Sequence, residues 1–432
     1  MKVKSIRQLR NLAGKKVFLR ADFNVPLRKG EVQDDYKIAA ALPTIRYLLR
    51  YKCKIIIATH LGDAEGGKNM VRSVKPVAER LRELLGRKVK LVNDCLGKSA
   101  EKEASKMKEG EILVLENLRF YKEEENNNSN FAKSLAGLAQ IYPAPFKIPR
   151  PLAARPIKSI FAARFNTPPQ RCGIYVNDAF AVCHRNHASV SAIKKYLPSY
   201  AGLLIEKEIV NLEKALKPKK PLVVVIGGAK VSTKLPFVKK VFNKAERILV
   251  GGALANIFLA AKGYEVGKSL APKEEIKVLK RESLFLKKSS YRKILLPIDV
   301  VVGDKIDGRG KAAVRMADKV GKNEIILDIG PATIKFYSKN IKEAKTIIWN
   351  GPMGKFEAEH FKHGTLAIAR LIASRSRGRA FGLVGGGETV EALKMTGMMD
   401  YVDWVSTGGG AMLAFLAGEP MPGLEGIVKY KV

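Results

Sequence analysis

The sequence predicts an α/β protein of two domains, each built on a parallel sheet covered by helices. Its 432 residues suit two domains of ordinary size, and short apolar runs alternate along them with longer amphipathic runs. Strand, helix and strand in series require crossover connections, which make neighbouring strands parallel. Ligands of such sheets gather at the carboxyl ends of the strands, and the unusual residues of this chain fall there.

The expected strands are nine apolar runs, and their ends differ between the two halves of the chain. Runs whose ends carry Arg, His and Asn come first: "KVFLRADF", "KIIIATHL", "EILVLENLRF" and "GIYVNDAF". Runs associated with Gly-Gly and Lys follow: "PLVVVIGG", "RILVGGAL", "KILLPIDVVV", "KTIIWNGP" and "AFGLVGGG". Helical spacing is found between them, as in "SVKPVAERLRELLG" and "FAKSLAGLA". We therefore expect a domain for a small anion followed by a domain for a nucleotide.

A helical segment divides the chain. Residues 202–221 have helical spacing and end in "KPKKP", so we expect a helix that joins an N-terminal domain, 1–201, to a C-terminal domain, 222–432. Residues 141–173, inside the first domain, contain seven prolines, six cations and no acidic residue. Each proline removes a backbone donor and fixes φ, which excludes a continuous helix or a central strand.

Composition and charge limit the classes of protein to which the chain can belong. No apolar run reaches the roughly 18 residues of a transmembrane helix, and the start "MKVKSIRQLR" lacks an apolar signal region, so we expect a cytoplasmic protein. The formal net charge of +37 predicts affinity for anions in general. Because the cations are spread along the chain, a generally basic surface is favoured. A nucleic-acid-binding protein is the alternative, although interleaved aromatics and known nucleic-acid motifs are missing from the sequence.

Glycine-rich turns in the second half are typical of sites for nucleotide phosphates. "VIGGAKVSTK" places Gly227 and Gly228 at a strand end, where bare backbone amides approach phosphate oxygens. Lys230 and Lys234, four residues apart, would share one helical face. "VGGGETVEAL" and "VSTGGGAMLAFL" each place three glycines before a helix, whose dipole favours an anion. Glu388 is a natural Mg²⁺ ligand, or alternatively a carboxylate that only favours its own helix start.

Arginine, histidine and asparagine gather at strand ends in the first half. "LRADFNVP" presents Arg20, Asp22 and Asn24 on one strand face by period two, although an Arg beside an Asp is equally consistent with a structural pair. Further strand ends supply five cationic or titratable residues: His60, Arg119, His184, Arg185 and His187. Convergent Arg and His suit a ligand with both carboxylate and phosphate, because guanidinium forks bind such oxygens in pairs.

Together these motifs closely resemble those of the phosphoglycerate kinase family, over nearly the whole chain. They occur in the family's order: "RADFNVP", "AALPTI", "HLG", "LENLRFYKEEE", "YVNDAF", "HRNHAS", "GGAKVS", "WNGPMGKFE" and "VSTGGGA". The resemblance implies two Rossmann-like domains around a hinge that closes before transfer. It also implies a kinase that reversibly transfers a phosphoryl group between 1,3-bisphosphoglycerate and MgADP, giving 3-phosphoglycerate and ATP. We expect a monomer whose partners are these small molecules, without membrane or dedicated nucleic-acid contacts.

The resemblance also implies which residues bind each ligand. Contacts with 3-phosphoglycerate are expected at Arg20, Asp22, Phe23, Asn24, Lys37, His60, Leu61, Gly62, Asp63, Arg119 and Arg185. Nucleotide contacts are expected at Gly228, Lys230, Lys234, Gly252, Asn350, Glu357, Gly385, Gly386, Gly387, Glu388 and Thr389. The residues expected to act on the transferring group are Lys37 and Lys234, and Glu388 is expected to hold Mg²⁺.

The sequence departs from the family's pattern at positions of the expected site. Lys37 stands where the family carries an arginine, and lysine keeps the charge but loses the bidentate fork. Asp63 replaces another substrate-side arginine, Glu388 replaces the usual Asp, and Ala181 and Ala253 replace glycines. A weakened or inactive kinase homologue that still binds nucleotide is therefore the alternative to a working enzyme.

The proline-rich segment also departs from the family. The dipeptide "IY" at 141–142 recurs at 174–175, and the family passes from "FAKSLAGLAQ" almost directly into "IYVNDAF". Residues 141–173 are therefore interpreted as an insertion, which could be a basic surface loop, a partner-binding arm or translated sequence foreign to the gene. We expect a poorly ordered, exposed excursion that leaves the "YVNDAF" strand and Arg185 in place.

Overall fold

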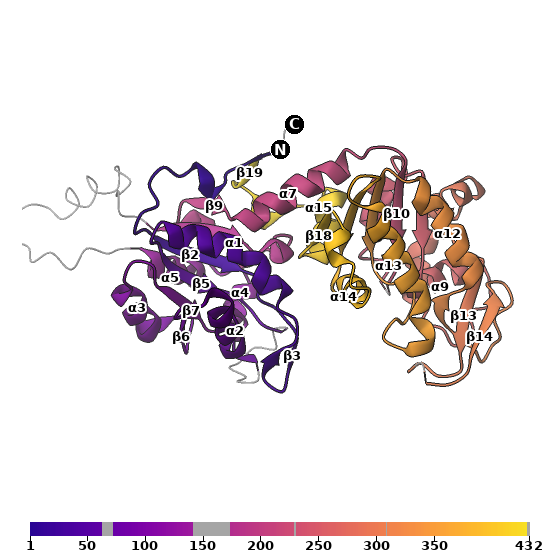
Figure 1. Ribbon diagram of the computed structural model, residues 1–432, viewed down its shortest axis with the longest axis horizontal. Helices are drawn as coiled ribbons and strands as arrows, with labels where there is room; N and C mark the ends of the chain where they lie inside the picture. The colour runs from indigo at the N-terminus through magenta and orange to yellow at the C-terminus, as the bar shows by residue number, and fades with distance from the viewer. Residues whose placement is uncertain (63–71, 141–172, 229, 308, 430–432) are drawn as a thin grey trace, which may run out of the picture. The chain divides into compact units, whose positions relative to one another are not determined.

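Two compact units make up the chain. The computed structural model describes residues 1–62, 72–140, 173–228, 230–307 and 309–429. Unit 1 comprises Met1–Ile209 and Met421–Val432, and unit 2 comprises Val210–Pro420 (Figure 1). In the described ranges every helix is too short or too polar to cross a membrane.

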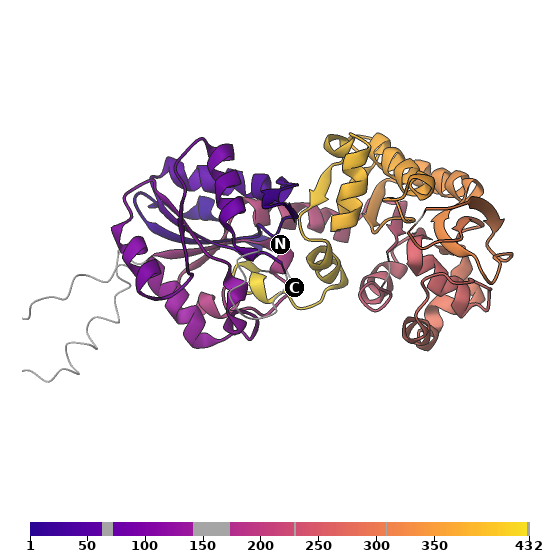
Figure 2. The same cartoon turned by 90° about the horizontal axis from the view of Figure 1, so that it is seen from below.

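Unit 1 is built on a six-stranded parallel sheet with the order β6-β7-β5-β2-β8-β9. Its strands are β2 (Lys16–Ala21), β5 (Lys54–Ala58), β6 (Lys90–Val92), β7 (Ile112–Leu115), β8 (Ile174–Asp178) and β9 (Ser199–Ala201). Its helices are α1 (Tyr36–Arg50), α2 (Lys75–Leu85), α3 (Gly97–Lys106), α4 (Lys122–Glu125) and α5 (Ser129–Ala139). Helices cover both faces of the sheet (Figure 2).

Side chains alternate between the two faces of the unit 1 sheet along each strand. Because both faces are buried, the strands are continuous apolar runs. Val17 and Leu19 of β2 enter one core with Ile45 of α1 and Leu81 of α2. Phe18, between them, points to the opposite face, where α5 packs on β2. Both faces of the sheet are therefore buried, as the succession of strands and helices in the sequence predicted.

Unit 2 contains a second parallel sheet and a smaller antiparallel one. The parallel order is β12-β11-β10-β16-β17-β18, and the antiparallel order is β14-β13-β15. The strands are β10 (Leu222–Ile226), β11 (Arg247–Val250), β12 (Ile294–Leu295), β13 (Asp299–Gly303), β14 (Ala312–Met316), β15 (Ile325–Ile329), β16 (Thr346–Asn350), β17 (Phe381–Gly385) and β18 (Trp404–Ser406). The helices are α8 (Leu235–Phe242), α9 (Gly252–Ala261), α10 (Lys273–Arg281), α11 (Ser283–Leu286), α12 (Pro331–Glu343), α13 (His363–Arg375), α14 (Gly387–Met395) and α15 (Gly409–Ala417).

The strand orders locate the places where ligands are expected. β2 lies between β5 and β8 in unit 1, and β10 lies between β11 and β16 in unit 2. The chain builds each sheet outward in both directions from these strands, so the connections leave them on opposite sides. A crevice at the carboxyl ends of the strands follows from this reversal. The two-domain α/β class predicted from the sequence is confirmed.

The structure corrects the prediction for "KILLPIDVVV". This run is not one strand, because it divides into β12 and β13, which belong to different sheets. Pro297, between them, offers no backbone donor for a continuous ladder. Asp299 of β13 then accepts hydrogen bonds from the backbone nitrogens of Ala332 and Thr333 and so caps the start of α12.

Three local predictions are also corrected. β2 ends at Ala21, so Asp22 and Asn24 lie in the following loop and not on a strand face. Lys230 precedes α8 and Lys234 is its N-cap residue, so the two lysines do not share a helical face. The helix expected over 202–221 is α7 (Leu203–Leu216), which stops before Pro218 because proline disfavours the helical region for the residue preceding it.

The C-terminal residues belong to unit 1, whereas the sequence placed all of 222–432 in one domain. β19 (Val428–Lys429) pairs antiparallel with β1 (Lys2–Val3). Gly423 donates from its nitrogen to the Cys183 carbonyl at 2.9 Å, and its carbonyl accepts from Asn177 Nδ2 at 2.9 Å. Pairing between the two ends of a chain leaves no periodic signal, so the sequence pattern could not indicate it.

The expected insertion falls almost wholly outside the described residues. Its flanks are described: α5 ends at Ala139, and β8 begins at Ile174 as the predicted "YVNDAF" strand. Gly173 lies so close to α5 that a Cβ there would overlap the carbonyl oxygen of Ala139. The helix and the strand are therefore adjacent at the two ends of the segment.

We predict that Gly423→Ala destabilises unit 1 by about 1 to 3 kcal/mol. An added Cβ would lie 2.7 Å from Val190 Cγ1 and 2.8 Å from Cys183 Cα, so the C-terminal segment must shift. Gly137→Ala, in α5, is the matched control, because a Cβ there meets no described atom within 4 Å. Chemical denaturation followed by circular dichroism measures both; equal midpoints for the two variants would contradict the assigned packing.

We further predict that deleting residues 141–172 and joining Gln140 to Gly173 preserves folding. Because the flanks already meet, the shorter connection lowers the entropy cost of loop closure and raises the free energy of unfolding by up to about 2 kcal/mol. Turnover is expected to be unchanged or higher. Loss of cooperative unfolding in the deletion variant would show that the segment is structural.

Candidate active site

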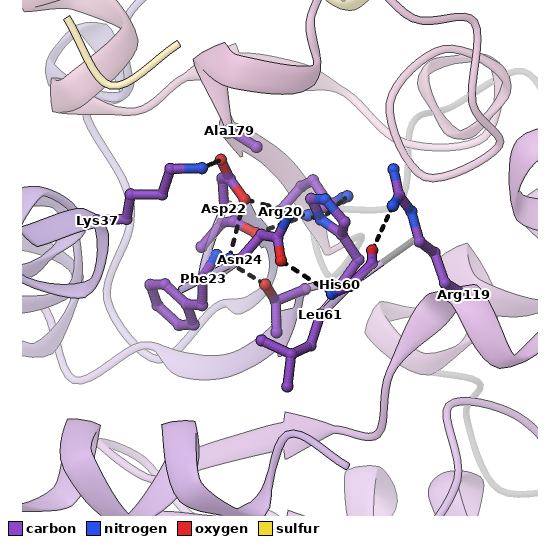
Figure 3. A network of polar contacts seen from close by, with 12 residues as sticks. Arg20, Asp22, Phe23, Asn24, Lys37, His60, Leu61, Arg119 and Ala179 are labelled. Carbon is purple, nitrogen blue, oxygen red and sulfur yellow. Dashed lines mark hydrogen bonds and ion pairs between the residues drawn. The ribbon is translucent and has the colours of Figure 1, made fainter. Parts of the chain in front are cut away.

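Polar side chains from several strand ends meet at the carboxyl edge of the unit 1 sheet (Figure 3). Arg20 lies near the end of β2, and Asp22 and Asn24 follow that strand. His60 follows β5, and Arg119 lies in the turn after β7. Four of these five side chains are buried, Asn24 being the half-buried one. The cluster is therefore enclosed by the protein and is not a group of solvent-exposed charges.

A network of dedicated partners holds the guanidinium of Arg20, a residue that is only 1% exposed. Its Nε donates to Ser189 Oγ at 2.8 Å, one terminal nitrogen donates to the Ala21 carbonyl at 2.6 Å, and the other lies 3.2 Å from His60 Nδ1. Ser189 in turn donates through its hydroxyl and its backbone nitrogen to Glu124 at 2.5 and 2.9 Å. Burial raises the pKa of Glu124, and the charge of Arg20 opposes that rise.

Lys37 and Asp22 form an ion pair beside this network. Lys37 Nζ lies 2.8 Å from Asp22 Oδ2, and the Asn24 backbone donates to Asp22 Oδ1 at 3.1 Å. Burial alone would raise the pKa of Asp22, but Lys37 and the hydrogen bonds lower it to about 2. Asp22 is consequently ionised at neutral pH. Burial also lowers the pKa of His60 well below its usual value, although Asp22 opposes this, so His60 is neutral.

Asparagine side chains hold the loop from His60 to Gly62. Asn24 Oδ1 accepts from the Gly62 nitrogen at 2.9 Å. Asn117 Oδ1 accepts from the nitrogens of Leu61 and Arg119 at 3.2 and 3.0 Å, and its Nδ2 donates to the Leu61 carbonyl at 2.8 Å. The guanidinium of Arg119 donates to the Gly62 carbonyl. The loop is therefore fixed before any ligand arrives.

Positive charge converges on this edge of the sheet. Burial, followed by the charges of Arg20, Arg185 and Arg119, lowers the pKa of His187 to about 3. Arg20 and Arg119 also act on His60 in the same direction. The side chain of Arg185 is exposed, unlike the other two guanidinium groups. Glu125, whose Oε1 lies 3.4 Å from Arg119 Nε, offsets part of this positive charge, and the three guanidinium groups together favour an anion.

In unit 2, glycines let the ends of β10 and β16 approach each other. A Cβ on Gly227 would overlap the Pro352 carbonyl oxygen, and a Cβ on Gly351 would overlap the Gly227 carbonyl oxygen. Gly228 has φ +84° and Gly252, at the start of α9, has φ +58°, a region that L side chains rarely adopt. Some of the glycines that predicted a phosphate site are therefore needed for close packing of the backbone.

A cavity of about 310 Å³ lies beside these glycines. Its walls include Gly228 and Gly252, and the apolar part includes Leu270 and Ile326. Three acidic residues, Asp328, Glu357 and Glu388, also line it, together with Lys355. The combination of an apolar chamber with a few polar groups is typical of a small-molecule site.

Two of the expected nucleotide residues use their side chains to hold the protein backbone. Asn350 Nδ2 donates to the Gly385 carbonyl at 2.7 Å, and Thr389 Oγ1 accepts from the Gly351 nitrogen at 2.7 Å. Gly387, the first residue of α14, has open space at its Cβ position among the described atoms. The described atoms therefore leave space next to Gly387 at the start of α14.

The two lysines near β10 differ in environment. Lys234 is half-buried, and its Nζ lies 2.7 Å from the position that a Cβ would take on Gly228. Desolvation lowers the pKa of Lys234, while the carboxylates of Glu388 and Glu275 oppose that shift. Lys230 is exposed. The structure therefore places Lys234 next to Gly228 and leaves Lys230 at the surface.

The structure brings most of the expected site residues together within each unit. Phe23 and Leu61 contribute buried apolar side chains, and Asp63 lies outside the described residues. Sequence reasoning missed Glu124 and Ser189, which hold Arg20. Glu124 lies in the run "KEEE", which is typical of a solvated helix end, and no local pattern marks it as 1% exposed.

Comparison with known proteins agrees with the motifs. The sequence model of the family described as "Phosphoglycerate kinase" matches residues 6–143 and 163–419. The phosphoglycerate kinase of Dictyoglomus turgidum is 43% identical over 427 residues, which cover 98% of each chain. That of Borrelia garinii is 39% identical over 432 residues, covering 99% of this chain and 100% of the relative.

Solved structures give the same result. Phosphoglycerate kinase from Coxiella burnetii superposes with a TM-score of 0.76 at 36% identity, and the enzyme from Pyrococcus horikoshii OT3 with 0.78 at 30%. Each alignment covers 98% of both chains. Similarity along the full length does not favour a non-catalytic or nucleic-acid-binding role. The chain belongs to the phosphoglycerate kinase family and is a phosphotransferase with a carboxyl group as acceptor and ATP or ADP as its nucleotide substrate.

Proposed function

We propose that the arginine and histidine cluster of unit 1 binds 3-phosphoglycerate. The observation that carries this proposal is the gathering of Arg20, His60 and Arg119 at the carboxyl ends of β2, β5 and β7, where a guanidinium nitrogen of Arg20 lies 3.2 Å from His60 Nδ1. A ligand with a carboxylate at one end and a phosphate at the other supplies the negative charge that such a cluster favours. Within the cluster Asp22 pairs with Lys37 and Glu125 pairs with Arg119, so a bound anion would compete with these two carboxylates.

The proposed reaction needs alignment and charge neutralisation, and no general base. In the direction that consumes ATP, the attacking carboxylate has a pKa of roughly 3 to 4 and is already ionised at neutral pH. The residues of the chain must hold its oxygen in line with the γ-phosphoryl group and exclude water. Because the two proposed ligand sites belong to different units, transfer requires that the units bring the ligands into contact.

We propose that the cavity of unit 2 binds ATP or ADP. Glu357 would accept hydrogen bonds from the ribose hydroxyls, and Lys234 would contact the phosphates. The half-buried position of Lys234 beside Gly228 supports this role, because an ammonium in a desolvated place interacts strongly with an anion. The open N-terminus of α14 offers backbone nitrogens to the same phosphates.

We propose that Glu388 holds Mg²⁺ on the nucleotide. Among the described residues no group of three or more His, Cys, Asp or Glu could hold a metal ion by itself. Mg²⁺ is commonly bound by one or two carboxylates together with phosphate oxygens and water, so one exposed carboxylate at the cavity fits it. The ion would neutralise charge on the phosphates, while Glu388 fixes its position.

The function itself is tested by a coupled assay of ATP consumption with 3-phosphoglycerate. We expect turnover that depends on both substrates. Binding of MgADP without turnover would instead indicate a homologue that has lost catalysis.

We predict that Lys37→Met lowers kcat by about 10² to 10³. Lys37 supplies the proposed charge at the transferring phosphoryl group, and its removal also leaves buried Asp22 without its ion-pair partner. Lys37→Arg should raise kcat, because the guanidinium fork holds two oxygens at once. Lys133→Met, on the exposed face of α5, is the control. An unchanged kcat in Lys37→Arg together with Lys37→Met would place residue 37 outside the catalytic site.

We predict that Glu388→Gln raises the Mg²⁺ concentration for half-maximal activity by more than tenfold. Glu388→Asp should keep activity, because it keeps the charge on a side chain one methylene shorter. Glu391→Gln, exposed on the same helix, removes a charge without facing the cavity and is the matched control. Equal Mg²⁺ titrations for Glu388→Gln and Glu391→Gln would rule out Glu388 as the ligand.

A further inference from the structure

A chain of directed hydrogen bonds runs from Glu124 to the imidazole of His60. Both oxygens of the Glu124 carboxylate accept from Ser189, at 2.5 Å from its hydroxyl and 2.9 Å from its backbone nitrogen. The Ser189 hydroxyl has a single proton and gives it to Glu124, so its oxygen accepts from Arg20 Nε at 2.8 Å. All four side chains are buried, and these bonds are therefore shielded from competing water.

The direction of these bonds decides the role of each nitrogen of His60. A guanidinium group can only donate, and a terminal nitrogen of Arg20 lies 3.2 Å from His60 Nδ1 (Figure 3). Because His60 is neutral, its Nδ1 must accept this bond, which leaves the ring proton on Nε2. Asp22 Oδ1 lies 3.8 Å from the same Nδ1, beyond hydrogen-bond distance. The structure therefore favours the Nε2–H tautomer of His60.

The opposite tautomer has a competing partner in Asp22. With its proton on Nδ1, His60 would donate toward the Asp22 carboxylate and would face the donors of Arg20. The tautomer therefore depends on how firmly Arg20 is held beside Nδ1. Ser189 is the side chain that anchors Arg20 Nε, and Glu124 fixes Ser189.

The remaining nitrogen of His60 is available to a ligand. Among the described residues none bonds Nε2, and this atom is not fully enclosed by the protein. An imidazole with its proton on Nε2 donates there, whereas the other tautomer presents an acceptor that would repel carboxylate or phosphate oxygens. The tautomer consequently decides whether His60 attracts or repels an anionic ligand.

We propose that Glu124 is a positioning residue of the 3-phosphoglycerate site. Through Ser189 it holds Arg20 so that His60 keeps its proton on Nε2 and donates to the ligand. This inference rests on the proposed function, in which the cluster binds 3-phosphoglycerate. Because Glu124 is 1% exposed and both its oxygens are used by Ser189, it sets the affinity for the ligand without contacting it.

The other acidic residues of α4 have different surroundings. Glu125 Oε1 lies 3.4 Å from Arg119 Nε, and Glu123 is exposed. Glu123→Gln therefore removes the same charge from the same helix as Glu124→Gln, while the bonds to Ser189 stay intact.

The tautomer is measured by long-range proton–nitrogen correlation NMR spectra of the full chain with isotope-labelled histidine. The chain has five histidines, and His60→Gln assigns the signals of His60. In the wild-type chain at neutral pH, we expect Nδ1 to show the shift of an unprotonated nitrogen and Nε2 that of a protonated one. In Glu124→Gln and in Ser189→Ala, a second population with the proton on Nδ1 should appear.

The same variants are assayed for turnover. Glu124→Gln should raise KM for 3-phosphoglycerate about tenfold, because the ligand meets an acceptor in place of a donor. The value of kcat should change little, since Lys37 and Lys234, which are proposed to act on the transferring group, lie outside this chain of bonds. Glu123→Gln is the matched control and should keep the wild-type KM and the wild-type His60 spectrum.

Ser189→Ala has its own control. Ser199→Ala also removes a buried hydroxyl from unit 1, one that donates to the Leu197 carbonyl at 2.8 Å. We expect Ser189→Ala to raise KM as Glu124→Gln does, whereas Ser199→Ala should leave KM and the His60 spectrum unchanged.

The outcomes separate the inference from the function on which it rests. A wild-type His60 with its proton on Nδ1, or on both nitrogens, would overturn the inference even when a variant fails to fold. An unchanged spectrum and KM in Glu124→Gln or Ser189→Ala would also overturn it, since Glu124 would then serve only the packing of α4. If saturating 3-phosphoglycerate shifts no signal of His60 while turnover proceeds, the proposed ligand site is wrong and the inference falls with it.

Discussion

Burial of the Arg20 guanidinium is the constraint on which the rest of the unit 1 site depends. A charge that is 1% exposed must find its partners inside the protein, and it finds Ser189, the Ala21 carbonyl and His60. Ser189 is held by Glu124, so a short acidic helix far along the chain fixes the orientation of an arginine in the central strand. The site is consequently rigid before any ligand binds, which favours binding by a preorganised surface.

Close packing also shapes the site of unit 2, but there it involves the backbone. There the backbones at the ends of β10 and β16 approach so closely that side chains are excluded at Gly227 and Gly351. Asn350 and Thr389 fasten these turns to the start of α14. The glycines therefore act on the packing of the backbone, and the amides of Gly227 and Gly351 donate to the Asn350 carbonyl and to Thr389 Oγ1.

The ion pair between Lys37 and Asp22 bears on the effect of lysine at position 37, where the family carries an arginine. Lysine keeps a positive charge at the expected position, yet Asp22 is ionised and holds its ammonium at 2.8 Å. In the role proposed for Lys37, a phosphoryl group would compete with that carboxylate for the ammonium, whereas an arginine could bond both at once through its fork. The effect on turnover of lysine in place of arginine therefore depends on hydrogen-bond geometry, because both residues carry the same charge.

The sequence by itself determined most of the strands and helices, the two-domain α/β class and the family, because apolar runs and long motifs are local features. It also identified the residues of the proposed ligand sites, including Arg20 and His60. Only the tertiary structure decided that Glu124 is buried, that "KILLPIDVVV" divides between two sheets, and that residues 421–432 return to unit 1. These features arise from contacts between residues far apart in the chain, such as Asn177 with Gly423, and a local pattern of residue types carries no record of such contacts.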